Sequence, residues 1–172
     1  MAGTLPEPWL RGPLPDVHPL LAPVLRSLEQ AREDLGKHTE GLATEQIWAR
    51  PHGLPPLGFQ LRHIAGSIGR LATYLAGRQL DDAQMAAMRA EMGPCASREE
   101  LLAAIDQAIA RAGETIRAVD VGTLAEPRSV GRKQLPTTVI GLLVHIAEHT
   151  QRHVGQAIAA AKLARAVDTP GV

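Results

Sequence analysis

Four stretches of the chain place apolar residues three and four positions apart, and this spacing constrains the fold more than any other feature. Each stretch is about 20 to 30 residues long and predicts an amphipathic helix with one apolar stripe. No such helix can bury its stripe alone, so four of them are expected to pack together as an all-α four-helix bundle. The predicted helices cover residues 19–38, 57–77, 97–119 and 135–165.

The composition favours helices over sheets. Aromatic residues make up only 2% of the chain, whereas Ala, Leu and Arg, which are strong helix formers, are abundant. Hydrophobic residues at 45% and charged residues at 21% are typical of a globular protein and exclude a mainly disordered chain. A chain of 172 residues has room for one domain.

The segments outside the four helices are rich in proline, glycine or polar residues. Six of the 13 prolines precede residue 24, so residues 1–15 are expected to form an extended arm, because proline fixes φ and lacks an amide donor. The third helix is predicted to begin at a capping box formed by Ser97 and Glu100. The remaining expectations are a bundle domain over 16–166, a short helical turn at 44–49, a breaker at 51–56, a long connection with about one helical turn at 81–96, a polar crossover at 120–136 and a tail at 167–172.

The charge and the cysteine content limit which binding partners and which cellular compartment are expected for this protein. Lys plus Arg (18) equal Asp plus Glu (18), so the chain has no bulk positive charge for nucleic-acid binding. The single cysteine, Cys95, cannot form an intrachain disulfide, fits a reducing cytoplasm and is not expected to be catalytic. No signal peptide and no run of 18 apolar residues is found, so we expect a cytoplasmic protein without a membrane span.

Three of the seven histidines lie in the last predicted helix, at His145, His149 and His153. Residues four apart differ by only ~40° around a helix, so the three rings follow one stripe. The helical rise separates His145 from His153 by ~12 Å, too far for one ion whose bonds to imidazole are ~2 Å long. One metal ion can therefore bind only one adjacent pair from this helix.

Helical phase selects the pair. Relative to Ile146, His153 lies at about 20° and His149 at about 60°, whereas His145 lies near 100°, at the edge of the buried side. Burying two imidazoles costs free energy unless their nitrogens bind a metal ion or hydrogen-bond to the backbone, as those of ordinary core histidines do. The buried stripe on which this phase rests comprises Val139, Leu142, Ile146, Ala157 and Ala160.

The third ligand of such a site has to come from another helix. His63 in the second helix is the best candidate, and His18, His38 and His52 rank behind it. His63 lies about 200° from Leu61, on the side of Phe59, Gln60 and Tyr74, so spacing alone does not place it inside. If that side faces the core, the Leu61 stripe faces a neighbouring helix or a second subunit.

Two other kinds of metal site fit the sequence poorly. Residues 145–149 match the His-x-x-Glu-His pattern of inverted zinc peptidases, but the only acid after His149 is Asp168 in the tail. Di-iron bundles need Glu-x-x-His motifs, and no acid stands three residues before any histidine. Glu148 is predicted to point outward, about 200° from Ile146, and to be a solvated surface acid.

Three motifs carry a family resemblance: IWARPH at 47–52, LGFQLRHIA at 57–65 and LLVHIAEHTQRHVGQ at 142–156. In this order they resemble the DinB/YfiT-like superfamily over about residues 17–165. The resemblance implies that His63, His149 and His153 are the three metal ligands. Gly155 and Gln156 match the Gly-Gln of the family motif, whereas Val154 stands where many members have a second histidine.

The resemblance also implies a function. Members are four-helix bundles with a long connection between helices two and three, are commonly homodimers, and bind Zn²⁺, Ni²⁺ or a similar divalent ion through three histidines and waters. Some are S-transferases that use bacillithiol, mycothiol or glutathione, and others hydrolyse or isomerise. We therefore expect a metal-dependent transferase or hydrolase with an open three-histidine site for a small molecule, in which Gln60, Tyr74 and Gln156 orient ligands or substrate. The alternative is a non-catalytic, homodimeric, stress-related binding module with a structural metal.

Overall fold

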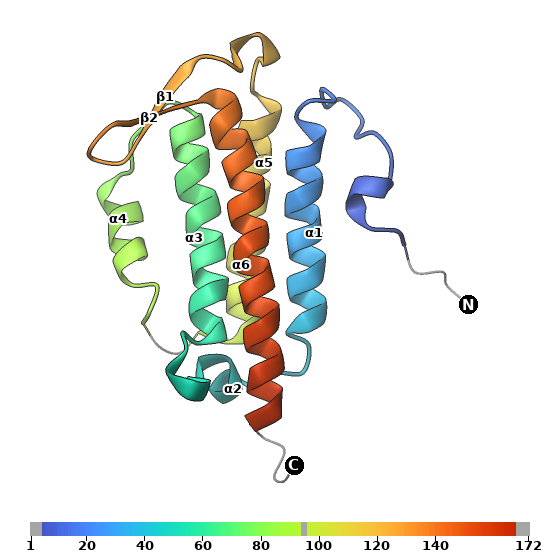
Figure 1. Ribbon diagram of the computed structural model, residues 1–172, viewed down its shortest axis with the longest axis vertical. Helices are drawn as coiled ribbons and strands as arrows, with labels where there is room; N and C mark the ends of the chain where they lie inside the picture. The colour runs from blue at the N-terminus through green and yellow to red at the C-terminus, as the bar shows by residue number, and fades with distance from the viewer. Residues whose placement is uncertain (1–4, 94–95, 168–172) are drawn as a thin grey trace.

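Four long helices form the body of the protein in the computed structural model, which describes residues 5–93 and 96–167 (Figure 1). Helices α6 and α5 each pack against both α1 and α3, so α1 and α3 lie diagonally across the bundle. Figure 1 shows α1 and α6 running in one direction and α3 and α5 in the other. The predicted helical bundle is confirmed, with α1 at Ala22–His38, α3 at Leu57–Leu75, α5 at Arg98–Arg117 and α6 at Val139–Val167.

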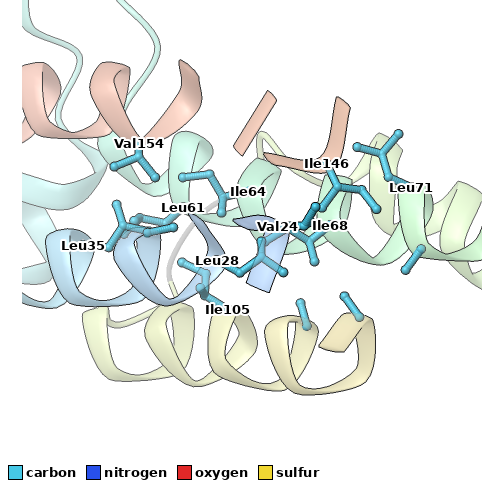
Figure 2. Packing of buried hydrophobic residues seen from close by; sticks show 14 of the residues in the cluster. Val24, Leu28, Leu35, Leu61, Ile64, Ile68, Leu71, Ile105, Ile146 and Val154 are labelled. Carbon is cyan, nitrogen blue, oxygen red and sulfur yellow. The ribbon is translucent and has the colours of Figure 1, made fainter. Parts of the chain in front are cut away.

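The core is continuous along the bundle axis. Figure 2 shows Leu61 and Ile64 of α3 close to Leu35 and Leu28 of α1, with Val154 of α6 on the other side. Leu61 is completely buried. Of the two alternatives for its stripe, a neighbouring helix or a second subunit, the structure shows a neighbouring helix, because α3 packs against both α5 and α6 and is covered on more than one side. The largest fully buried side chains include Leu28, Leu35, Leu61, Ile64, Ile68, Ile105, Ile116, Leu143 and Ile146.

Short helices connect the long ones. The predicted turn between α1 and α3 is α2 (Thr44–Trp48), followed by the 3-10 turn η2 (Pro51–Gly53). The long connection holds α4 (Asp82–Arg89), which is longer than the single turn expected there. The predicted capping box at the start of α5 is present, with the Glu100 amide donating to Ser97 Oγ at 3.2 Å and the Ser97 amide donating to Glu100 Oε2 at 2.8 Å.

The predicted polar crossover contains a β-hairpin. After the 3-10 turn η3 (Val121–Thr123), strands β1 (Pro127–Val130) and β2 (Leu135–Thr138) pair antiparallel. The last helix therefore begins at Val139 and not near residue 135, because backbone pairing with β1 and the extended preference of the residue before Pro136 keep this segment out of the helix. Arg128 Nε donates to the Leu75 carbonyl at 3.2 Å and holds the hairpin over the end of α3.

The N-terminal arm folds back onto α1. It contains one 3-10 turn, η1 (Pro8–Leu10), so it is not extended throughout. The guanidinium of Arg11 forms ion pairs with Glu29 at 3.0 Å and Glu33 at 2.6 Å, both on α1. Residues 168–172 of the predicted tail and Cys95 lie outside the described residues. None of the described helices is long and apolar enough to cross a membrane.

Candidate metal centre

The structure brings His63 of α3 together with His149 and His153 of α6. One ring nitrogen from each of the three lies within 4.8 Å of the others. The Nε2 atoms of His63 and His149 are 3.3 Å apart, and the ring centroids of His63 and His153 are 4.3 Å apart. All three residues are half-buried. The other described histidines do not belong to this group.

Glu148 points outward from the three-histidine group, and His145 lies at the edge of this group, with its ring centroid 5.1 Å from that of His149. His145 Nδ1 lies 2.6 Å from Glu148 Oε1, and the two side chains are 45% and 43% exposed. The outward position predicted for Glu148 from helical phase is therefore the one observed. A site built on the His-x-x-Glu-His pattern would need both side chains at the ion, and the structure does not offer that arrangement.

The three imidazoles fit a divalent metal ion. Two imidazole nitrogens at ~2.0 to 2.1 Å from a tetrahedral ion are ~3.3 Å apart, which matches the separation of the His63 and His149 Nε2 atoms. His149 Nδ1 is buried and has no hydrogen-bond partner among the described residues. Imidazole ligands suit zinc, nickel and similar ions, so the donor set agrees with the predicted cofactor class.

Two glutamines lie beside His153. The buried Gln60 places its Oε1 3.0 Å from His153 Nδ1, so this nitrogen donates and Nε2 is left with its lone pair. Gln156 stands three residues after His153 on α6, so its exposed side chain lies on the same face of the helix. Both glutamines therefore lie next to one of the three histidines.

Tyr74, the other residue predicted to orient ligands or substrate, lies near the far end of α3 from His63. It stands eleven residues after His63 on α3, which returns it to nearly the same face but places it ~16 Å further along the axis. A tyrosine side chain cannot span that distance. Helical spacing gives the face on which a residue lies but not its position along the bundle axis, and the structure does not bring Tyr74 to the three histidines.

Glu91 is a site residue that sequence reasoning missed. It lies in the turn after α4, is 8% exposed, and its Oε2 accepts a hydrogen bond from His63 Nδ1 at 2.8 Å. Its Oε1 accepts from Arg70 Nη1 at 2.6 Å. A carboxylate on one nitrogen of a metal-binding histidine fixes the tautomer and turns the other nitrogen toward the ion.

The α3 helix is shaped to receive Glu91. A Cβ added at Gly66 would lie 2.6 Å from Arg70 Nη1 and 2.7 Å from Glu91 Oε1, so the glycine leaves room for this ion pair. Arg62 donates to the carbonyls of Ala90 and Gly93 and holds the turn that carries Glu91. His63, Gly66 and Arg70 follow one another at intervals of three and four residues, so they lie on one face of α3, toward Glu91.

The electrostatics suit a metal centre. Burial raises the pKa of Glu91, but hydrogen bonds from His63 and Arg70 outweigh it, so the pKa lies below its ordinary value and the carboxylate is ionised. Burial, with repulsion from His153, His145 and His63, lowers the pKa of His149 to about 4. Burial and the neighbouring His63 also lower the pKa of His153. His149 and His153 are therefore neutral near pH 7, the form that binds metal.

Replacing Glu91 by glutamine is expected to weaken metal binding by about 10- to 100-fold, the usual effect of losing an outer carboxylate partner. The variant keeps the side-chain size but removes the charge that fixes the His63 ring. Competition with a chromophoric chelator measures the affinity. Glu148→Gln is the matched control, since Glu148 is next to His149 in sequence but exposed. This variant should bind the metal ion as tightly as the wild type. Equal affinity for Glu91→Gln and wild type would contradict the role given to Glu91.

Comparison with known proteins places the chain in a family. The DinB superfamily model matches residues 27–157, a range that includes His63, Glu91, His149 and His153. Among solved structures, the chain is similar to YfiT from Bacillus subtilis, described as a probable metal-dependent hydrolase with an unusual four-helix bundle topology. The two share 16% sequence identity with a TM-score of 0.63, over 91% of this chain and 93% of that one, a likeness in fold. No curated protein sequence matches the chain. On the family match, which covers most of its length, this protein belongs to the DinB superfamily.

Proposed function

We propose that this protein is a hydrolase that depends on a divalent metal ion held by His63, His149 and His153. The observation that carries the proposal is the convergence of three imidazoles from two helices, with no fourth His, Cys, Asp or Glu in the group among the described residues. Structural zinc sites are closed by four protein ligands, whereas catalytic sites use three and leave a position open. The description of YfiT as a probable metal-dependent hydrolase supports the same reaction class.

The residues around the site have separate roles in this proposal. Glu91 and Gln60 hold the rings of His63 and His153 so that their Nε2 atoms face a common point. When bound, a divalent ion supplies Lewis acidity, which makes water nucleophilic near neutral pH and polarises a substrate carbonyl. Gln156, which is exposed beside His153, presents an amide that can hydrogen-bond the substrate.

The test combines metal analysis with a reaction panel. Protein purified without an affinity tag is expected to bind about one ion per chain, and the metal-loaded form to hydrolyse members of a panel of esters and amides. The chelator-treated form should be inactive. Reaction only after addition of a small thiol would replace the hydrolase proposal by an S-transferase. Bound metal without either reaction would favour the non-catalytic homodimeric module, in which the ion only ties α3 to α6.

A further inference from the structure

A pocket of about 450 Å³ opens beside His153, between the second half of α6, the start of α3 and the connection from α2 through η2. Ten of its fourteen lining residues are alanine, proline, leucine or phenylalanine. The other four are three glutamines and His153, and no Asp, Glu, Lys or Arg lines the pocket. The pocket is therefore mostly apolar and uncharged, and its polar groups are Gln46 of α2 and the side chains at His153.

The pocket reaches the three-histidine group at His153, which lines it. On α6 its wall is formed by His153, Gln156, Ala160 and Leu163, which repeat at intervals of three and four and so continue the stripe that carries the histidines. From His153 to Leu163 this wall is ~15 Å long. On α3, Phe59 lines the pocket and stacks on His63 with ring centroids 5.6 Å apart.

We infer that this pocket binds an uncharged, apolar acyl or alkyl chain of the substrate, with the reacting carbonyl group at the three histidines. This inference rests on the proposed function and names its substrate class. An apolar lining favours each buried methylene, whereas a carboxylate at the end of the chain would lose its hydration without meeting a cation. Carboxylate-bearing thiols such as glutathione are therefore poor occupants of this pocket.

A series of hydroxamates tests the inference, because a hydroxamate head group binds metal ions and the chain behind it can be varied. For the zinc-loaded protein, affinity is expected to rise about threefold or more per methylene from acetohydroxamate to octanohydroxamate, which gives at least ~700-fold over the six added methylenes. The monohydroxamate of octanedioic acid has the same length but ends in a carboxylate. It should bind at least ~10-fold more weakly than octanohydroxamate.

A cation placed in the pocket should reverse this preference. In Leu163→Lys, the carboxylate-ended hydroxamate is expected to bind more tightly than octanohydroxamate. Ile140→Lys is the matched control, since Ile140 is 40% exposed on the same helix but does not line the pocket. Its preference should equal that of the wild type. An unchanged preference in Leu163→Lys would show that the chain lies elsewhere.

A readout without metal separates this inference from the proposed function. In metal-free protein, octanamide is expected to shift the methyl NMR signals of Leu54 and Leu163, which line the pocket, but not those of the buried Leu143. Protein that binds no zinc but shows these shifts would remove the hydrolase proposal and keep the apolar site. Zinc binding with no dependence on chain length, or no shift with octanamide, would overturn the inference and keep the metal centre.

Discussion

Replacing His149 by alanine is expected to reduce the bound metal from about one ion per chain to none, and His63→Ala and His153→Ala should do the same. Structural zinc sites with four ligands bind with ~10 to 16 kcal/mol, so one ligand contributes on the order of 3 to 4 kcal/mol, or ~10²- to 10³-fold in affinity. With only three histidines at the site, the loss of one leaves too few ligands to retain the ion during dialysis. Hydrolysis should be lost with the metal.

His145→Ala is the matched control for these variants. It removes the same side chain from the same helix one turn before His149. The His145 ring lies beside that of His149, with centroids 5.1 Å apart, but its Nδ1 faces Glu148 and it is not one of the three residues whose ring nitrogens converge. Elemental analysis after dialysis against a weak chelator measures the metal, and circular dichroism verifies that each variant is folded. Metal retained by His153→Ala and lost by His145→Ala would show that the other adjacent pair binds the ion.

Leu61→Ala is expected to lower the free energy of unfolding by ~2 to 5 kcal/mol, because Leu61 is completely buried and its truncation leaves a cavity between the helices. Leu20→Ala is the control, since Leu20 is 56% exposed and its truncation should change stability by less than ~0.5 kcal/mol. Urea unfolding of metal-free protein measures both.

Repeating the Leu61→Ala measurement at several protein concentrations tests which surface the leucine packs against. If the Leu61 stripe is inside one chain, the loss of stability does not depend on concentration. A loss that grows on dilution would instead place the stripe at an interface between two chains, because dissociation then contributes to unfolding.

Much of the last helix could be predicted because its pattern is local. The phase of Val139, Leu142 and Ile146 fixes the buried side, and from it follows the inward position of His149 and His153 against the exposed His145. The same reasoning placed Glu148 outward. Both results need only the helical period and a contiguous stretch of sequence.

The hairpin and Glu91 could not be predicted in this way. The segment 127–138 shows no alternation of apolar and polar residues, and its strands form because they pair with each other over the end of α3. Glu91 reaches His63, which is 28 residues earlier in the chain, through a turn that is fixed by Arg62 and Arg70 of α3. No spacing rule connects residues so far apart.

By itself, the sequence determined that the chain forms four amphipathic helices in a bundle and that two histidines of the last helix share its inner side, because these properties depend on contacts within one or two helical turns. The tertiary structure alone decided that His63 meets them, that Tyr74 does not, and that Glu91 completes the surroundings. The reason is that α3 is covered on more than one side, by α5, α6 and the turn after α4. Only the packing of all the helices fixes which side of α3 faces α6 and how the residues of the two helices are aligned along the bundle axis.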